Sequence, residues 1–313
     1  MIRPKWILAL AALSVCSFLA PTAQAEKKLA VVATIPDLAD LARQIGGDRV
    51  DVLSLAKGTE NVHRVALRPS GLVAVGRAEL FLQVGLSLEH AFVPGLLEAA
   101  RNSRLEPGKP GLVTVSDGFE ALDVPADVSR SDAADVHPMG NPHMNLSPAA
   151  GRHMAGRVLA GLIGVDPEGK DVYTANHRRY LEALTEAEAR WAKLGERLKA
   201  KKIVVYHREF SYFAAAYGME VVGEVEPKPG VPPTPSHLAG LVKVIQEHDV
   251  CAVLTAGWSN DRNVRFLGER TDAVALELPT MVGGNKRATS WIALMDEWHE
   301  RLADVLDPVS KDG

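Results

Sequence analysis

The histidines of this chain are the residues whose positions point most directly to chemistry. Three of the ten stand beside predicted strands or helices. His63 lies in a polar loop after a predicted strand, His143 lies just before a predicted helix, and His207 follows the apolar run 203–206. Imidazole nitrogen is a good ligand for borderline cations such as Zn²⁺. These positions predict a metal site.

Glu277 is the nearest candidate for a fourth ligand, because it stands near the end of the predicted strand 274–278. Three imidazoles and one carboxylate complete a tetrahedron without a catalytic water, which suits the capture of an ion rather than catalysis. The candidates are 80, 64 and 70 residues apart and match no local metal motif. Taken singly, each histidine has an alternative role as a hydrogen-bonded or solvated residue, and Glu277 as a solvated charge.

The elements that must position these residues alternate between strands and helices. The first half of the chain has strand patterns at 29–35, 50–55, 80–84 and 112–115, and the second half has them at 202–206, 221–225, 252–255 and 274–278. Such alternation predicts parallel sheets covered by helices. Ligands bind at the carboxyl ends of strands in open parallel sheets, so we expect the donors of both halves to converge.

One long helix is expected between the two halves. Residues 170–201 contain no proline and a single glycine, and their apolar residues recur at spacings near 3.6. About 30 helical residues extend roughly 45 Å, which is long enough to pack along both halves. We therefore predict an α/β fold in which two parallel-sheet domains, 26–168 and 202–313, are joined by a linking helix over 169–201. The metal site is expected in the interdomain cleft.

The first 25 residues are typical of a signal peptide. They combine basic residues near the start, an apolar run over 6–19 and the small-residue segment Ala23-Gln24-Ala25. The run of 14 residues is shorter than the roughly 20 that span a membrane. We expect cleavage after Ala25 and a periplasmic location. Cys16 is an alternative lipid-attachment site, but the usual small residue does not precede it, which favours soluble export.

Composition excludes several other classes of protein. Hydrophobic residues make up 47% of the chain and charged residues 24%, as in a folded soluble protein. The 35 basic and 39 acidic residues give a formal net charge of −4, so we expect no nucleic-acid partner. Cys251 is the one cysteine after the signal segment, and no internal disulfide is expected.

The chain resembles the periplasmic zinc- and manganese-binding proteins of ABC transporters, the ZnuA-like and TroA-like receptors of cluster A-I. The similarity runs from about Leu29 to Leu306. It is carried by the long helix and by three segments: Glu60-Asn61-Val62-His63, Asn141-Pro142-His143-Met144-Asn145-Leu146-Ser147-Pro148, and Val204-Val205-Tyr206-His207 followed by Phe210-Ser211-Tyr212-Phe213.

The resemblance implies that His63, His143 and His207 occupy the first three ligand positions. The family usually places an Asp directly before a Pro after the last strand, whereas Leu278 precedes Pro279 here. Glu277, the nearest carboxylate, or a water is then the fourth ligand. A loop before His143 carries a metal-collecting insertion in some relatives, and His137 stands there as a single histidine, either handing metal inward or inert.

The same resemblance implies a receptor that captures Zn²⁺ as its transported ligand and delivers it to an ABC permease in the inner membrane. His207 favours zinc, because manganese receptors of the family tend to have a carboxylate at that position. A Mn²⁺ receptor of the same fold is the alternative. We expect a monomer without enzymatic activity, and we name a periplasmic metal chaperone as a further partner.

Two rival functions come from other classes of protein. A zinc hydrolase would use three histidines and a bound water. It would also need a general base, and although Glu60 and Glu209 are close to the histidines in sequence, neither forms a pattern such as H-E-x-x-H. A structural or adhesive exported protein is the third reading, and no residue supports it.

Overall fold

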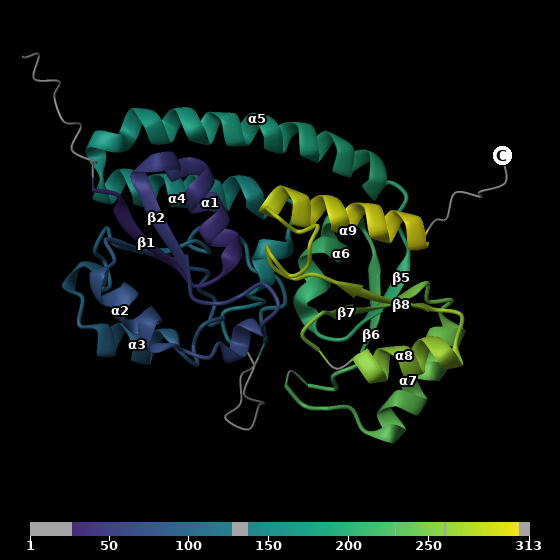
Figure 1. The fold of residues 1–313 in the computed structure, drawn as a ribbon. Helices are drawn as coiled ribbons and strands as arrows, with labels where there is room; N and C mark the ends of the chain where they lie inside the picture. Colours follow the sequence, from purple (N-terminus) through teal and green to yellow (C-terminus); the bar gives the residue numbers. More distant parts are fainter. Residues whose placement is uncertain (1–26, 127–136, 229, 260, 307–313) are drawn as a thin grey trace, which may run out of the picture.

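The computed structural model describes residues 27–126, 137–228, 230–259 and 261–306. The predicted signal peptide lies outside these residues. Two four-stranded sheets, each with all its strands parallel, form two lobes, and one long helix runs along both (Figure 1). The α/β fold with two parallel-sheet domains and a linking helix is therefore confirmed.

The first lobe has the strand order β2-β1-β3-β4. Its strands are β1 (Leu29–Ala33), β2 (Val50–Ser54), β3 (Leu80–Gln83) and β4 (Leu112–Thr114). Helices α1 (Pro36–Gly46) and α4 (Ala150–Val165) cover one face of the sheet, and α2 (Pro69–Arg77) and α3 (Val93–Ala100) cover the other (Figure 1). Proline at the start of α1, α2 and α3 suits the first helical turn, where a backbone N–H has no intrahelical partner.

The second lobe repeats this arrangement with the strand order β6-β5-β7-β8. Its strands are β5 (Lys202–Val205), β6 (Glu220–Glu224), β7 (Ala252–Ala256) and β8 (Val274–Leu278). Helices α6 (Ser211–Tyr217) and α9 (Trp291–Leu306) lie on one side of the sheet, and α7 (Pro235–Glu247) and α8 (Asp261–Arg270) lie on the other (Figure 1). In both lobes the second strand of the sequence is at an edge, and the first strand is inside.

The linking helix α5 spans Lys170–Gly195, so it is shorter than the predicted range 169–201. The chain turns over residues 196–200 before β5 begins. The buried face of α5 includes Tyr173, Tyr180, Leu184 and Trp191, and the helix packs on α1 and α4 in the first lobe and on α9 in the second. The helix therefore packs against both lobes, as its apolar periodicity predicts.

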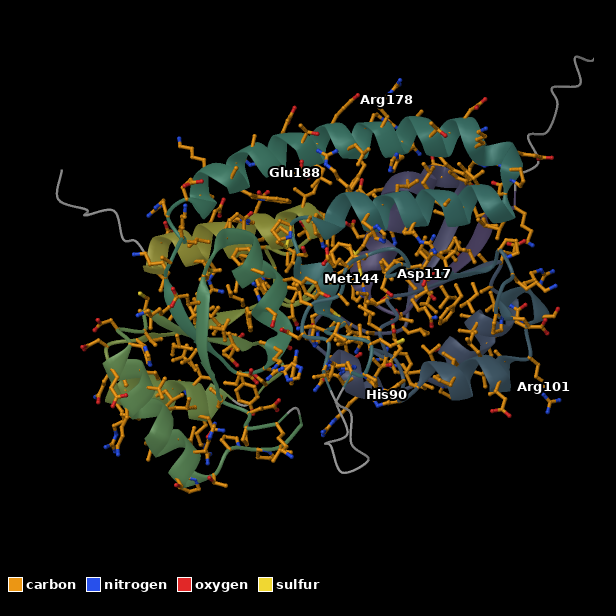
Figure 2. All side chains as sticks on the ribbon, turned by 180° about the vertical axis from the view of Figure 1, so that it is seen from behind. His90, Arg101, Asp117, Met144, Arg178 and Glu188 are labelled. Atoms are coloured by element: carbon orange, nitrogen blue, oxygen red, sulfur yellow. The ribbon has the colours of Figure 1, made fainter. Side chains whose placement is uncertain are left out.

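A continuous hydrophobic core runs from the first lobe into the second. At the junction, the fully buried rings of Trp191 and Trp291 meet edge to face with centroids 5.9 Å apart. The backbone N–H of Trp291 donates to Asp40 of α1 at 2.9 Å, and its indole N–H donates to the carbonyl of Asn145 at 2.7 Å. Side chains fill the junction when the molecule is seen from behind, with Met144 close to it (Figure 2). In the described part of the chain, no helix is long and apolar enough to cross a bilayer.

Candidate metal centre

Two of the predicted ligands lie in the same kind of hydrogen-bonded turn. His63 lies in a short 3₁₀ turn, η2 (Val62–Arg64), and His143 begins another, η4 (His143–Leu146). In each case the asparagine two residues earlier accepts a hydrogen bond from the histidine backbone N–H: Asn61 from His63 and Asn141 from His143, both at 2.9 Å. Asparagine side chains favour such tight turns. The spacing Asn-X-His is thus a local sequence signal for both positions.

His207 is positioned by a strand and by a second-lobe carboxylate. It lies two residues after the end of β5 and directly precedes the 3₁₀ turn η6 (Arg208–Phe210). Its Nδ1 is 2.9 Å from Oε2 of Glu226, which follows β6. A carboxylate on one ring nitrogen orients the ring and raises the basicity of the other nitrogen, as in many zinc sites. Metal binding by His207 therefore falls to Nε2.

The structure brings the three histidines together where the two lobes meet. The Nε2 atoms of His63 and His143 are 3.3 Å apart. The ring centroid of His207 is 5.6 Å from that of His63 and 5.3 Å from that of His143. All three residues are at most 4% exposed. Residues 64 to 144 positions apart in the sequence thus converge at one point, from the carboxyl ends of both sheets.

The surroundings disfavour the charged form of the His63 and His143 imidazoles. Burial lowers the pKa of His63 and His143 well below the ordinary value, and the neighbouring histidines lower both further. Nδ1 of His63 has no hydrogen-bond partner among the described residues. A neutral imidazole has a lone pair available for a cation, so these residues are prepared for metal binding without first releasing a proton.

His137 is closer to this centre than the sequence indicates. It is not a solitary exposed residue, because its ring stacks on that of His63 with centroids 5.1 Å apart. Ring nitrogens of His63, His137 and His143 all lie within 4.8 Å of one another. Burial lowers its pKa to about 4. His90, which is exposed (Figure 2), is next to it with centroids 6.2 Å apart.

Glu277 lies outside this group of histidines. Its side chain is exposed at the end of the edge strand β8, close to Gly257, and within the described chain no hydrogen bond or ion pair joins it to the imidazoles. Successive residues of a strand face opposite sides, and the inward position belongs to Leu278, which is fully buried. The structure thus lends Glu277 no support as a ligand.

Glu209 is a buried carboxylate close to the histidines, and it was not among the ligands predicted from the sequence. It lies in η6, two residues after His207, and is only 1% exposed. Burial raises its pKa to about 7. It lines a small cavity together with His143, Thr280 and Met281. Its proximity to His207 was a weak signal, because a residue two positions from a ligand points toward or away from the site depending on the turn that follows.

Hydrogen bonds across the junction hold the His143 segment against the second lobe. The Asn141 side-chain amide donates to the carbonyl of Arg208 at 2.7 Å, and the Tyr212 hydroxyl donates to the carbonyl of Asn141 at 2.7 Å. Asn145 donates to Asp37 of α1 and to the carbonyl of Thr280, both at 3.2 Å. The segment that carries His143 is therefore fixed from both lobes.

Comparison with known proteins gives a consistent family. The model of the zinc-uptake complex component A periplasmic family, ZnuA, matches residues 31–305. The manganese-binding lipoprotein MntA of Halalkalibacterium halodurans is 28% identical over 271 residues, covering 82% of this chain and 83% of that protein. The high-affinity zinc uptake system protein ZnuA of Bacillus subtilis is 23% identical over 287 residues, covering 89% and 88%.

A solved structure shares the fold. The crystal structure of a ZnuA protein superimposes with a TM-score of 0.74 at 22% identity, and the match covers 89% of this chain and 99% of that one. The proteins of the matched family are substrate-binding receptors, which removes the hydrolase alternative. The chain belongs to the ZnuA family of periplasmic zinc-uptake components and is a substrate-binding protein of a metal ABC transporter.

Proposed function

We propose that this receptor binds Zn²⁺ through Nε2 of His63, His143 and His207 and delivers it to an ABC permease in the inner membrane. The observation that carries the proposal is the 3.3 Å separation of the His63 and His143 Nε2 atoms, with the His207 ring against both. Zn–N bonds of about 2.0–2.1 Å in a tetrahedron separate two ligand nitrogens by about 3.3–3.4 Å. The His63 and His143 rings are thus spaced for zinc, and loading requires little movement of these two.

The donor set supports zinc over manganese. The names of the relatives do not distinguish the two metals, since one is a manganese-binding lipoprotein and another is a zinc uptake protein. Imidazole nitrogens suit Zn²⁺, whereas Mn²⁺ prefers carboxylate and carbonyl oxygens. Three clustered imidazoles, with Glu226 bonded to one of them, are a nitrogen-rich site. We therefore infer that zinc is the physiological cargo.

A receptor with this role is located outside the cytoplasm and has a membrane permease as its partner. Proteins of this family are extracytoplasmic and work with a membrane permease. We propose cleavage after Ala25 and release into the periplasm as a monomer that a metal chaperone can load. Mass spectrometry of the protein isolated from its own cells tests this: an unmodified N-terminus at Glu26 supports it, and a lipid on Cys16 contradicts it.

Uptake in cells is the decisive test of the metal. Almost any nitrogen-containing site binds Zn²⁺ more tightly than Mn²⁺, so affinities in vitro do not identify the cargo. We expect deletion of the gene to reduce accumulation of radioactive zinc and to leave that of manganese unchanged. The wild-type gene should restore uptake, and His143→Ala should not. A defect in manganese uptake alone would contradict the proposal.

A further inference from the structure

Glu209 is a buried acid whose environment is incomplete without a further partner. Its side chain is 1% exposed, and Oε2 has no hydrogen-bond partner among the described residues. The Trp258 side chain is the hydrogen-bond partner of the carboxyl group. A carboxyl oxygen buried without a partner carries a desolvation penalty of about 1–3 kcal/mol or more. Such a group in a folded protein needs an explanation, and a bound ion is one.

The cavity that Glu209 faces adjoins the histidines. Each of the segments that carry the three predicted ligands contributes to its lining: Val62 is next to His63, His143 itself lines it, and Glu209 follows His207 by two residues. Its volume of about 10 Å³ is close to that of one water-sized sphere. A single ion fits this space beside His143, the one proposed imidazole ligand that lines it, whereas an organic ligand does not.

The segment after β8 contributes no charged donor to the cavity. It lines the cavity with Thr280 and Met281, which follow β8, the strand where the resemblance places the acidic ligand. Leu278 is buried there, and Glu277 is exposed. Among the described residues that line the cavity, Glu209 is the one acid. The acid at this cavity therefore comes from η6, and the segment after the last strand, β8, provides none.

Charge balance also favours Glu209. Three neutral imidazoles leave a zinc ion with its full double positive charge, which is costly to bury. Glu226 supplies one negative charge through its bond to Nδ1 of His207. The Glu209 carboxylate supplies the second. Together the two acids make the buried centre neutral when the ion is bound.

We propose that Oε2 of Glu209 binds the transported ion as the fourth donor, in the role that the sequence assigned to Glu277. This inference rests on the proposed function, because it assumes that His63, His143 and His207 bind the same ion. It assigns the receptor a site of three nitrogens and one oxygen. The oxygen comes from the turn after β5 rather than from the loop after β8.

A set of matched variants tests the assignment by competition against a chromophoric zinc chelator at pH 7.5. Glu209→Gln keeps the size of the side chain, Glu209→Ala removes it, and Glu277→Gln makes the same chemical change at an exposed site. We expect both Glu209 variants to weaken Zn²⁺ binding about tenfold to hundredfold or more, and Glu277→Gln to leave it unchanged. The unfolding temperatures of the metal-free proteins identify any variant that does not fold.

A crystal structure of the zinc-loaded wild-type chain gives an answer independent of every variant. We expect one Glu209 oxygen about 2.0–2.2 Å from the ion. Wild-type affinity in Glu209→Gln, or an ion bound by His137 with Glu209 out of reach, would overturn the inference and leave the proposed function intact. Failure of the proposed function would appear differently, as unchanged zinc affinity in His143→Ala.

Discussion

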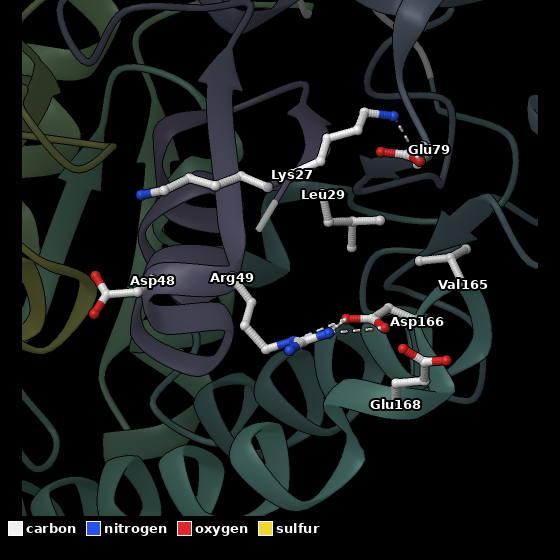
Figure 3. Close-up of a pocket in the computed structure, with 9 residues that line it drawn as sticks. Lys27, Leu29, Asp48, Arg49, Glu79, Val165, Asp166 and Glu168 are labelled. Atoms are coloured by element: carbon white, nitrogen blue, oxygen red, sulfur yellow. Dashed lines mark hydrogen bonds and ion pairs between the residues drawn. The ribbon is translucent and has the colours of Figure 1, made fainter. Parts of the chain in front are cut away.

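The two ends of the first sheet both gather ionisable side chains, but they differ in whether buried polar atoms there lack a hydrogen-bond partner. At the amino ends of the strands, a hollow of about 580 Å³ is lined by charged residues that include Lys27, Arg49, Glu79 and Asp166 (Figure 3). The charges of these four residues are paired. Arg49 donates to both carboxylate oxygens of Asp166, and the Lys27 ammonium is 3.5 Å from Glu79.

At the carboxyl ends, the cavity is far smaller and the donors are buried. It measures about 10 Å³, and Nδ1 of His63 and Oε2 of Glu209 have no hydrogen-bond partner in the described chain. Paired, half-exposed charges stabilise the fold, whereas buried donors without partners cost free energy until something binds them. Unsatisfied donors, rather than the volume of a hollow, therefore mark the functional end of this sheet.

Removing one imidazole should have the largest effect on the carboxyl end. We expect His143→Ala to weaken zinc binding at least about a hundredfold, because a complete zinc site is worth about 10–16 kcal/mol shared among its ligands. Asp166→Asn, at the paired end, is the matched control and should bind zinc like the wild type. Chelator competition measures both. Equal losses of zinc affinity in the two variants would mean that the carboxyl end of the sheet is not the metal-binding end.

Glu226 should show the next largest effect, because it acts on the ion only through His207. Its Oε2 is bonded to Nδ1 of that ring and accepts a hydrogen bond from the Gly230 backbone at 3.2 Å. We expect Glu226→Gln to weaken zinc binding about 10- to 100-fold, the usual cost of losing such a partner. Chelator competition would reveal this loss, and Glu224→Gln, two residues earlier in β6, serves as the comparison. Unchanged affinity would show that the bond does not orient His207.

The pH dependence of binding should be weaker than three ordinary histidines would give. Imidazoles with the ordinary pKa near 6.5 would together lose roughly a thousandfold in zinc affinity at pH 5.5. The pKa values of His63 and His143 are lowered, so protons compete with zinc at these two residues only at a lower pH. We expect a loss below a thousandfold between pH 7.5 and 5.5, measured by calorimetry, and protonation of Glu209, whose pKa is raised to about 7, supplies part of it. A full thousandfold loss would indicate unperturbed imidazoles.

At the amino ends of the strands, where Asp166 is paired with Arg49, we expect a small effect on the free energy of unfolding and none on zinc binding. Burial acts to raise the pKa of Asp166, but hydrogen bonds from Tyr173 and Arg49 outweigh it and leave the pKa lowered. The carboxylate therefore stabilises the fold above the unfolded-state pKa near 3.9, and this contribution is lost as the pH falls through the lower folded-state value. Asp166→Asn should cost about 1 kcal/mol at pH 7 and less at pH 3, measured by urea unfolding.

The fold was predictable because its signals are local. Strand and helix patterns identified the elements of both lobes, and the apolar face of α5 indicated a helix shared between them. His63, His143 and His207 were predictable as candidates because each adjoins such an element, and the resemblance to metal receptors gave them a common role. Parallel strands end at one edge of a sheet, which makes their convergence a topological consequence.

The other contributors to the centre were not predictable in the same way. Glu277 was selected because it is near the end of a strand, but the pleat turns it outward and Leu278 inward. His137 was set aside as a single loop histidine, and its ring stacks on His63, 74 positions away in the sequence. Glu209 was considered only as a general base beside His207 in the hydrolase alternative. In each case the outcome depends on packing between distant segments.

The amino-acid sequence by itself therefore determined the alternation of strands and helices, the linking helix and the three histidines that stand at the ends of elements. These features follow from periodicity and from turn chemistry within a few residues. Only the tertiary structure decided which acid faces the cavity and which further histidine joins the cluster. Those facts depend on the angles at which segments from two lobes meet, and no local pattern encodes such angles.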